Sequence, residues 1–142
     1  MDDIIYPNEE DFRIFINILQ QGDYSIKKYL PHIDENWYDI VVTQMNYVKN
    51  TSYYEDLNIY EVCSKILYKI TKKHELGDGN KRSGVICVVL FCLVNNFYIT
   101  KPSELKNLAR KIAKTRGRKN ENKIRKNITP DIKNIIELLS DK

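Results

Sequence analysis

The chain has 142 residues, of which 42% are hydrophobic and 30% charged, so its length fits one domain, residues 1–142, and excludes two ordinary domains. Only five Gly and four Pro residues exclude a collagen-like, low-complexity or turn-rich chain. The net charge of +4 hides an asymmetry, because the residues up to Glu61 include 12 acids and 4 bases, whereas the remainder include 7 acids and 19 bases.

The first half of the chain contains three stretches in which apolar residues follow helical spacing. Asn8, three residues before Asp11, predicts the start of the first helix, and Gly22 predicts its end. A polar loop is expected over residues 49–54, and Asp56 is the expected cap of the third helix. The expected apolar faces comprise Phe12, Phe15, Ile16 and Leu19, then Trp37, Ile40, Val41 and Val48, then Ile59, Val62, Cys63, Ile66 and Ile70.

Two further helices are predicted near the C-terminal end. Pro102 begins the first and Gly117 ends it, and Thr129-Pro130 provides a cap and a first-turn proline for the second. The basic residues 116–127 between them are expected to be poorly ordered. The expected apolar faces comprise Leu105, Leu108, Ala109 and Ile112, then Ile132, Ile135, Ile136 and Leu139. Because no segment alternates with a period of two for long, the predicted fold class is all-α.

The longest apolar run, Val85 to Val94, is apolar on every side and predicts a central, buried helix. It is much shorter than the about 20 residues that a membrane-spanning helix needs, and residues 1–3 are acidic rather than the basic start of a leader. We therefore expect a soluble, cytoplasmic protein without a membrane partner. Cys63, Cys87 and Cys92 form no CxxC pair, so we interpret them as reduced core thiols rather than a disulfide framework or a zinc site.

The segment just before this run breaks a local rule. Asp78, Gly79 and Asn80 are turn and cap residues, so the buried helix should begin near Asn80. Lys81 and Arg82 then fall in its first turn, where cations oppose the helix dipole at a cost of roughly 0.3–1 kcal/mol each. A local conflict without local compensation is typical of a functional site.

A bound anion would relieve this conflict, because free amides of the first turn and two cations form a place for a phosphate. Asp78 adds one carboxylate, which suits Mg²⁺ bound together with substrate phosphates, and His74 can accept a proton near neutral pH. Alone, His74 would be a surface residue, Asp78 a turn residue, and Lys81 and Arg82 a solvated pair. Together they indicate phosphoryl or nucleotidyl transfer.

The same segment resembles the signature loop of the Fic/Doc (filamentation-induced / death-on-curing) family, HxFx[DE][GA]NxR. In this chain the loop reads His74, Glu75, Leu76, Gly77, Asp78, Gly79, Asn80, Lys81 and Arg82. The resemblance is specific over about Ile59 to Phe97 and general elsewhere. It implies a helical Fic fold in which the active loop joins two central helices, with ATP and Mg²⁺ as cofactors.

The resemblance also implies a role for each residue of the loop. His74 would be the base that activates a hydroxyl of a target protein, Asp78 would hold Mg²⁺, and Arg82 would bind a nucleotide phosphate. The residues that would line the anion hole are Gly79, Asn80 and Lys81.

Two departures indicate the subclass. Family members that transfer AMP usually have Gly where this chain has Lys81 and a second Arg where it has Val85. The Asn-Lys-Arg form resembles Doc-like toxins, which move the γ-phosphate of ATP to a Thr or Ser hydroxyl. A translation factor is then a possible target, with elongation factor Tu as a candidate. Leu76 replaces the usual Phe and still supplies an apolar anchor.

The family's self-inhibitory element, [ST]xxxE[GN], is absent from the sequence. Residues 51–55 come closest, but Asp56 follows them where Gly or Asn is needed. An active enzyme without this element needs restraint from a second protein. The resemblance therefore implies a toxin paired with an inhibitory antitoxin protein.

Two alternatives stay open. The first is a Fic-type protein adenylyltransferase, which would move AMP instead of phosphate. The second is a catalytically inert module that binds nucleic acid through the basic residues 106–126, where Glu121 is the only acid. That stretch has no aromatic residue for base stacking, so we do not expect nucleic acid as a partner.

Overall fold

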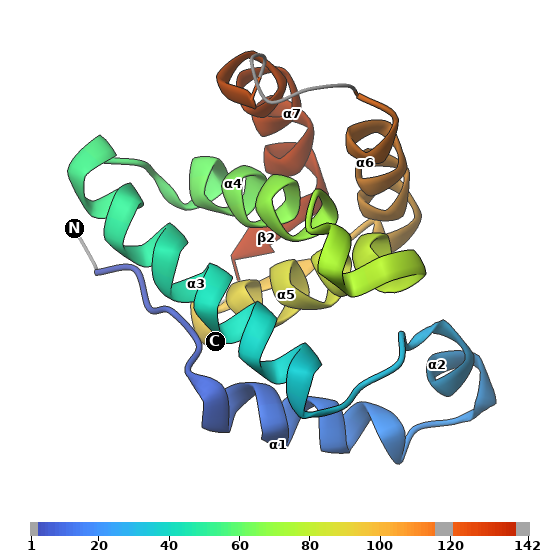
Figure 1. Ribbon diagram of the computed structural model, residues 1–142. Helices are drawn as coiled ribbons and strands as arrows, with labels where there is room; N and C mark the ends of the chain where they lie inside the picture. Colours follow the sequence, from blue (N-terminus) through green and yellow to red (C-terminus); the bar gives the residue numbers. More distant parts are fainter. Residues whose placement is uncertain (1–2, 116–120, 139–142) are drawn as a thin grey trace.

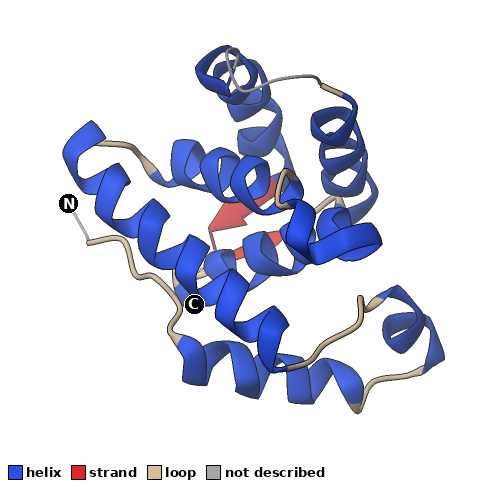
Figure 2. Ribbon diagram, viewed as in Figure 1, coloured by secondary structure: helices blue, strands red, loops and turns tan. Residues whose placement is uncertain are grey.

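The computed structural model describes residues 3–115 and 121–138, except for the side chains of residues 24, 25 and 78. Within these ranges the chain folds into seven α-helices, one 3₁₀ segment and two short strands (Figures 1 and 2). In chain order they are α1 (Glu9–Gln20), α2 (Tyr24–Tyr29), α3 (Glu35–Glu55), α4 (Ile59–Thr71), η1 (His74–Gly79), α5 (Asn80–Val94), β1 (Phe97–Ile99), α6 (Pro102–Lys114), α7 (Glu121–Ile135) and β2 (Ile136–Leu138).

The predominantly helical class is confirmed, with one addition. Strands β1 and β2 pair antiparallel, with Phe97 opposite Leu138 and Ile99 opposite Ile136, and they appear in Figure 2 as the two short arrows among the helices. Three-residue strands are too short to produce a visible alternation, which is why the sequence did not predict them. Ile136, expected on a helix, instead begins β2.

Several predicted helix ends are confirmed and others are wrong. Asn8 and Asp11 form the expected capping box: the Asn8 side chain accepts from the Asp11 amide at 2.9 Å, and the Asp11 carboxylate accepts from the Asn8 amide at 3.0 Å. The expected loop over residues 49–54 is helical, because Ser52 continues the buried face of α3. The Thr51 hydroxyl donates back to the Tyr47 carbonyl at 2.9 Å, so polar side chains are accommodated within the helix.

The N-cap of α4, expected at Asp56, lies two residues further along the chain. Asn58 caps α4 and forms a capping box with Glu61. Asp56 instead ends α3 in the left-handed conformation, with φ of 53°. An Asp tolerates that conformation, and its side chain is typical of both caps and turns, so the sequence alone could not separate the two roles.

The start predicted for the last helix is also wrong. Helix α7 is already formed at Glu121 and contains Pro130 in its interior. Pro130 removes only the hydrogen bond to the carbonyl of Lys126, an exposed residue whose carbonyl water can reach. Residues 121–127, expected to be poorly ordered, are therefore helical, whereas Gly117 and Leu139 lie outside the described residues.

Helices α4 and α5 occupy the middle of the molecule (Figure 1). Helix α4 packs against α3, α5, α6 and α7, and a Cβ atom on Gly84 of α5 would lie 2.5 Å from the Thr71 Oγ1 of α4, so the two helices cross closely there. Among the described residues, the predicted apolar faces are buried except for half-buried Phe15, Leu19, Ile40 and Ile59. The three cysteines are buried and free, as expected.

No helix in the described ranges combines the length and the apolarity that crossing a membrane requires.

Candidate active site

The segment η1 joins the two central helices. It begins at His74, three residues after the end of α4 at Thr71, and ends at Gly79, directly before α5 starts at Asn80. Gly77 has φ of 58° and ψ of −137°, a backbone conformation that glycine adopts readily and other residues rarely adopt. The Asn80 side-chain amide donates to the Thr71 carbonyl at 2.6 Å and so fastens the start of α5 to the end of α4. The helix start predicted near Asn80 is confirmed.

The N-terminus of α5 carries the conflict that the sequence predicts. Its N-cap is Gly79, which has no side chain to accept from the first-turn amides. Lys81 and Arg82 are both exposed there, and the first turn contains no acid. The Lys81 amide donates to the Asn80 Oδ1 at 2.8 Å. An anion at this end would meet two cations and the helix dipole.

Gly79 is also required by packing. A Cβ atom at this position would lie 2.6 Å from the Pro31 Cβ. The segment between α2 and α3 therefore lies directly against the start of α5. No other residue type fits this contact without displacing one of the two segments.

His74 is exposed at the entrance of the loop, where a hydroxyl from another molecule can reach it. Beside it, the Glu75 carboxylate lies 3.2 Å from the Lys73 Nζ. The pKa of Glu75 is held below its usual value by a backbone N–H, then by Lys73, with a smaller effect of His74 in the same direction. Leu76 is half-buried and packs against the core, as expected for the loop's apolar anchor.

Asp78 lies in η1 by its backbone, but its side chain is outside the described part of the chain. The structure therefore places His74, Gly79, Asn80, Lys81 and Arg82 in one loop and helix start without testing the metal role of Asp78. Among the described side chains, no three His, Cys, Asp or Glu residues gather as a metal centre.

A buried hydrogen bond that the sequence analysis missed supports the first turn of α5. The Trp37 indole of α3 donates to the Ser83 Oγ at 2.8 Å, and Ser83 is 0% exposed. This contact fixes the residue next to Arg82. A lone Ser at the start of an otherwise apolar helix is the signal that could have indicated such a partner.

Two residues outside the loop form a contact on the side of the molecule where α5 starts (Figure 1). The Lys106 Nζ of α6 lies 4.2 Å from the centre of the Tyr29 ring of α2. Burial raises the pKa of Tyr29, while the charges of Arg110 and Arg82 act against that increase. The start of α5 therefore shares its surroundings with the basic face of α6, which the sequence analysis did not connect with the loop.

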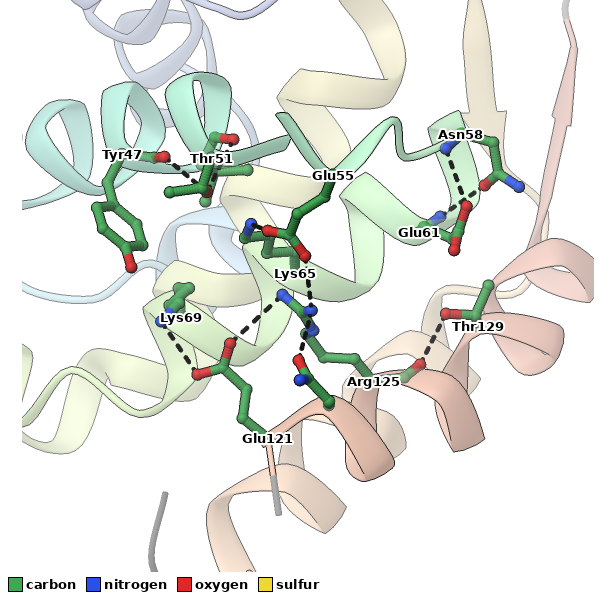
Figure 3. Close-up of polar contacts among 12 residues, drawn as sticks. Tyr47, Thr51, Glu55, Asn58, Glu61, Lys65, Lys69, Glu121, Arg125 and Thr129 are labelled. Atoms are coloured by element: carbon green, nitrogen blue, oxygen red, sulfur yellow. Dashed lines mark hydrogen bonds and ion pairs between the residues drawn. The ribbon is translucent and has the colours of Figure 1, made fainter. Parts of the chain in front are cut away.

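The structure also describes two positions on which the subclass prediction depends. Val85, which stands where AMP-transferring proteins have a second Arg, is only 6% exposed and so lies in the core. Glu55, in the stretch closest to the self-inhibitory element, pairs with Lys65 and with Arg125 (Figure 3). Glu55 is thus bound within the contacts that join α3, α4 and α7.

The comparisons with known proteins identify no relative. No family model matches the chain, and neither a curated protein nor a solved structure matches it. The Fic/Doc relationship therefore stays a hypothesis that rests on residues 74–82 and on their position between α4 and α5.

Proposed function

We propose that the protein is a Doc-like toxin, a transferase that moves the γ-phosphate of ATP to a Thr or Ser hydroxyl of a target protein. One observation carries this proposal: an exposed His74 and two exposed cations, Lys81 and Arg82, meet at the uncapped start of a buried helix. Phosphate binding explains the cations, and proton transfer explains the histidine.

In this proposal His74 accepts the proton of the target hydroxyl while that oxygen forms a bond to the γ-phosphorus of ATP. The bond from the same phosphorus to the bridging oxygen breaks, and ADP leaves with the electron pair. The Gly79-to-Lys81 backbone and the charge of Lys81 stabilise the negative charge that develops on the transferred group. Arg82 binds a phosphate of the nucleotide and orients it.

The proposed cofactors are ATP and Mg²⁺, with Asp78 as the metal ligand. Mg²⁺ is usually held by one or two carboxylates and by the substrate's phosphates, and Asp78 is the one carboxylate between Leu76 and Ser83. When bound, the metal would neutralise phosphate charge during transfer. Asp78 would hold it beside the uncapped helix start.

Phosphate transfer is favoured over AMP transfer by two side chains. Lys81 adds bulk and charge to the anion site, and the buried Val85 provides no second guanidinium. A pose of ATP that needs two arginines to hold its outer phosphates is therefore less well matched to this site.

The proposal includes two partners. An antitoxin protein restrains the enzyme, and a translation factor, with elongation factor Tu as the candidate, is its target. The lack of a self-inhibitory element supports external restraint. The nearest match offers no alternative, since its Glu55 is held by Lys65 and Arg125.

The experiment is a transfer assay with ATP labelled separately at the α- and γ-phosphates, using a cell lysate and purified elongation factor Tu. The wild type should label a protein from γ-labelled ATP only, and EDTA should stop the reaction. His74→Ala should lower the rate by roughly 10²–10⁴-fold, the usual value of general-base catalysis.

His32→Ala is the matched control, because it removes the chain's other histidine, an exposed side chain whose Nε2 lies 3.4 Å from an Asp34 carboxylate oxygen. It should leave the rate unchanged. Transfer of the α-label would replace the proposal by adenylyl transfer. If neither label is transferred, or if both histidine variants behave alike, the proposed enzyme is wrong.

A further inference from the structure

Tyr29 is the last residue of α2, two residues before the Pro31 that lies against Gly79 at the start of α5. The Lys106 Nζ of α6 lies 4.2 Å from the centre of its ring, and the charges of Arg110 and Arg82 oppose the increase that burial causes in the pKa of Tyr29. We call Tyr29, Arg82, Lys106 and Arg110 the Tyr29 cluster. The site described above uses only Arg82, so three members have no role in it.

The cluster is held in place by packing on both sides. Pro31, two residues after Tyr29, lies against Gly79 at the start of α5. Lys106 and Arg110 are four residues apart on α6 and so project from the same helix face, about 6 Å apart along it. In Figure 1, α2 and α6 both lie on the side of the molecule where the chain leaves α4 for α5. Tyr29 and the α6 cations thus lie on the side of the molecule where α5 starts (Figure 1).

Within the described side chains, no carboxylate offsets the positive charge of the cluster. Among the described residues, Arg82, Lys106 and Arg110 form no ion pair with a carboxylate, and Arg110 Nη1 donates to the neutral Asn107 Oδ1 at 2.8 Å. The acid on the same helix, Glu104, lies 3.8 Å from Lys101 instead. Three cations around one half-buried ring repel one another, and a multiply charged anion would relieve that repulsion.

We propose that the Tyr29 cluster binds the remaining phosphates of a polyphosphate chain whose terminal, transferred phosphate lies at the α5 N-terminus. This inference rests on the proposed function, for which it names the site of the nucleotide phosphates that are not transferred. A single phosphate at Gly79 to Arg82 does not extend to Lys106 and Arg110, whereas a triphosphate carries several charges in a row.

The experiment measures binding by calorimetry with inorganic tripolyphosphate and with inorganic phosphate as probes. The full chain is compared with the double variant Lys106→Gln and Arg110→Gln. We expect tripolyphosphate binding to weaken at least tenfold and phosphate binding to change less than twofold. Arg110→Gln alone, at an exposed position, should weaken tripolyphosphate binding about threefold or more, which protects the test against a folding defect in the double variant.

The control is the double variant Lys123→Gln and Lys126→Gln, which removes the same charge from exposed positions of α7. If it weakens tripolyphosphate binding as much as the α6 variant does, net charge alone explains the affinity and the inference is wrong. Tighter binding of a polyglutamate peptide than of tripolyphosphate would assign the cluster to an acidic protein segment and would also overturn it.

The two proposals can fail separately. If the wild type transfers no label from ATP while tripolyphosphate binding depends on Lys106 and Arg110, the proposed function is wrong and the polyphosphate site stands. If label is transferred but the α6 variant binds tripolyphosphate like the wild type, the inference is wrong and the proposed function stands.

Discussion

Lys81 is exposed in the first turn of α5, where its charge is unfavourable to the helix and favourable to a bound anion. We expect Lys81→Gly to lower γ-phosphate transfer by about 10²–10³-fold, as for the removal of one oxyanion donor. Glycine also opens space for a different nucleotide pose, so weak transfer of the α-label should become measurable.

Lys81→Gln separates charge from space, because glutamine keeps most of the side chain and loses the cation. It should lose phosphate transfer without gaining AMP transfer. Equal α-label transfer by the Gly and Gln variants would show that space at residue 81 does not set the nucleotide pose. Thermal unfolding of each variant checks that the helix start is intact.

At the scale of elements, the crossing of α4 and α5 depends on Gly84. A Cβ there would lie 2.5 Å from Thr71 Oγ1 and 3.3 Å from Leu67 Cδ1, so Gly84→Ala should destabilise the fold by about 1–3 kcal/mol, the usual cost of overpacking. Urea unfolding measures this. Thr71 Oγ1 has no hydrogen-bond partner among the described residues, so Thr71→Ala should relieve the clash and recover at least about 1 kcal/mol in the double variant. An unchanged cost of Gly84→Ala in that background would contradict the crossing.

The sequence predicted the helices better than their ends. Apolar spacing identified the faces of α1, α3, α4 and α6, because burial of one stripe decides those segments. Asp56 and Pro130 misled the prediction, since each is a common boundary residue that tertiary contacts here place differently. The packing of Val48 and Ser52 extends α3 past its polar stretch, and the ion pairs of Arg125 with Glu55 and Glu121 fix the first turns of α7. Such contacts join residues far apart in the chain.

The candidate site, too, could be predicted from the sequence only in part. His74 and Arg82 belong to one short segment, so sequence order alone places them together. Trp37 reaches Ser83 of α5, and Lys106 reaches the Tyr29 ring, only when the chain folds. No local pattern marks them, because an indole in a core and a lysine on a basic helix are ordinary features.

At the scale of the whole molecule, the acidic first part of the chain is tied to the basic remainder through Glu55. Its carboxylate pairs with Lys65, which is 2% exposed, and with Arg125, as Figure 3 shows. Glu121 extends the network to Lys69 at 3.0 Å. Contact with Lys65, followed by the charge of Arg125, holds the pKa of Glu55 below its usual value.

This lowered pKa predicts a dependence of stability on pH. A carboxyl whose pKa is lower in the folded state than in the unfolded state stabilises the fold above the unfolded value, about 4.3, and loses that contribution as pH falls through the folded value. The melting temperature should therefore drop below about pH 4.3. Glu55→Gln should melt at a lower temperature than the wild type at pH 7, because Lys65 stays buried without its partner, yet its melting temperature should fall less on acidification.

Circular dichroism between pH 7 and pH 3 measures both effects. Glu10→Gln, on the exposed side of α1, is the control and is expected to follow the wild type. An acid-induced drop as steep in Glu55→Gln as in the wild type would show that the network of Figure 3 does not join the two parts of the chain.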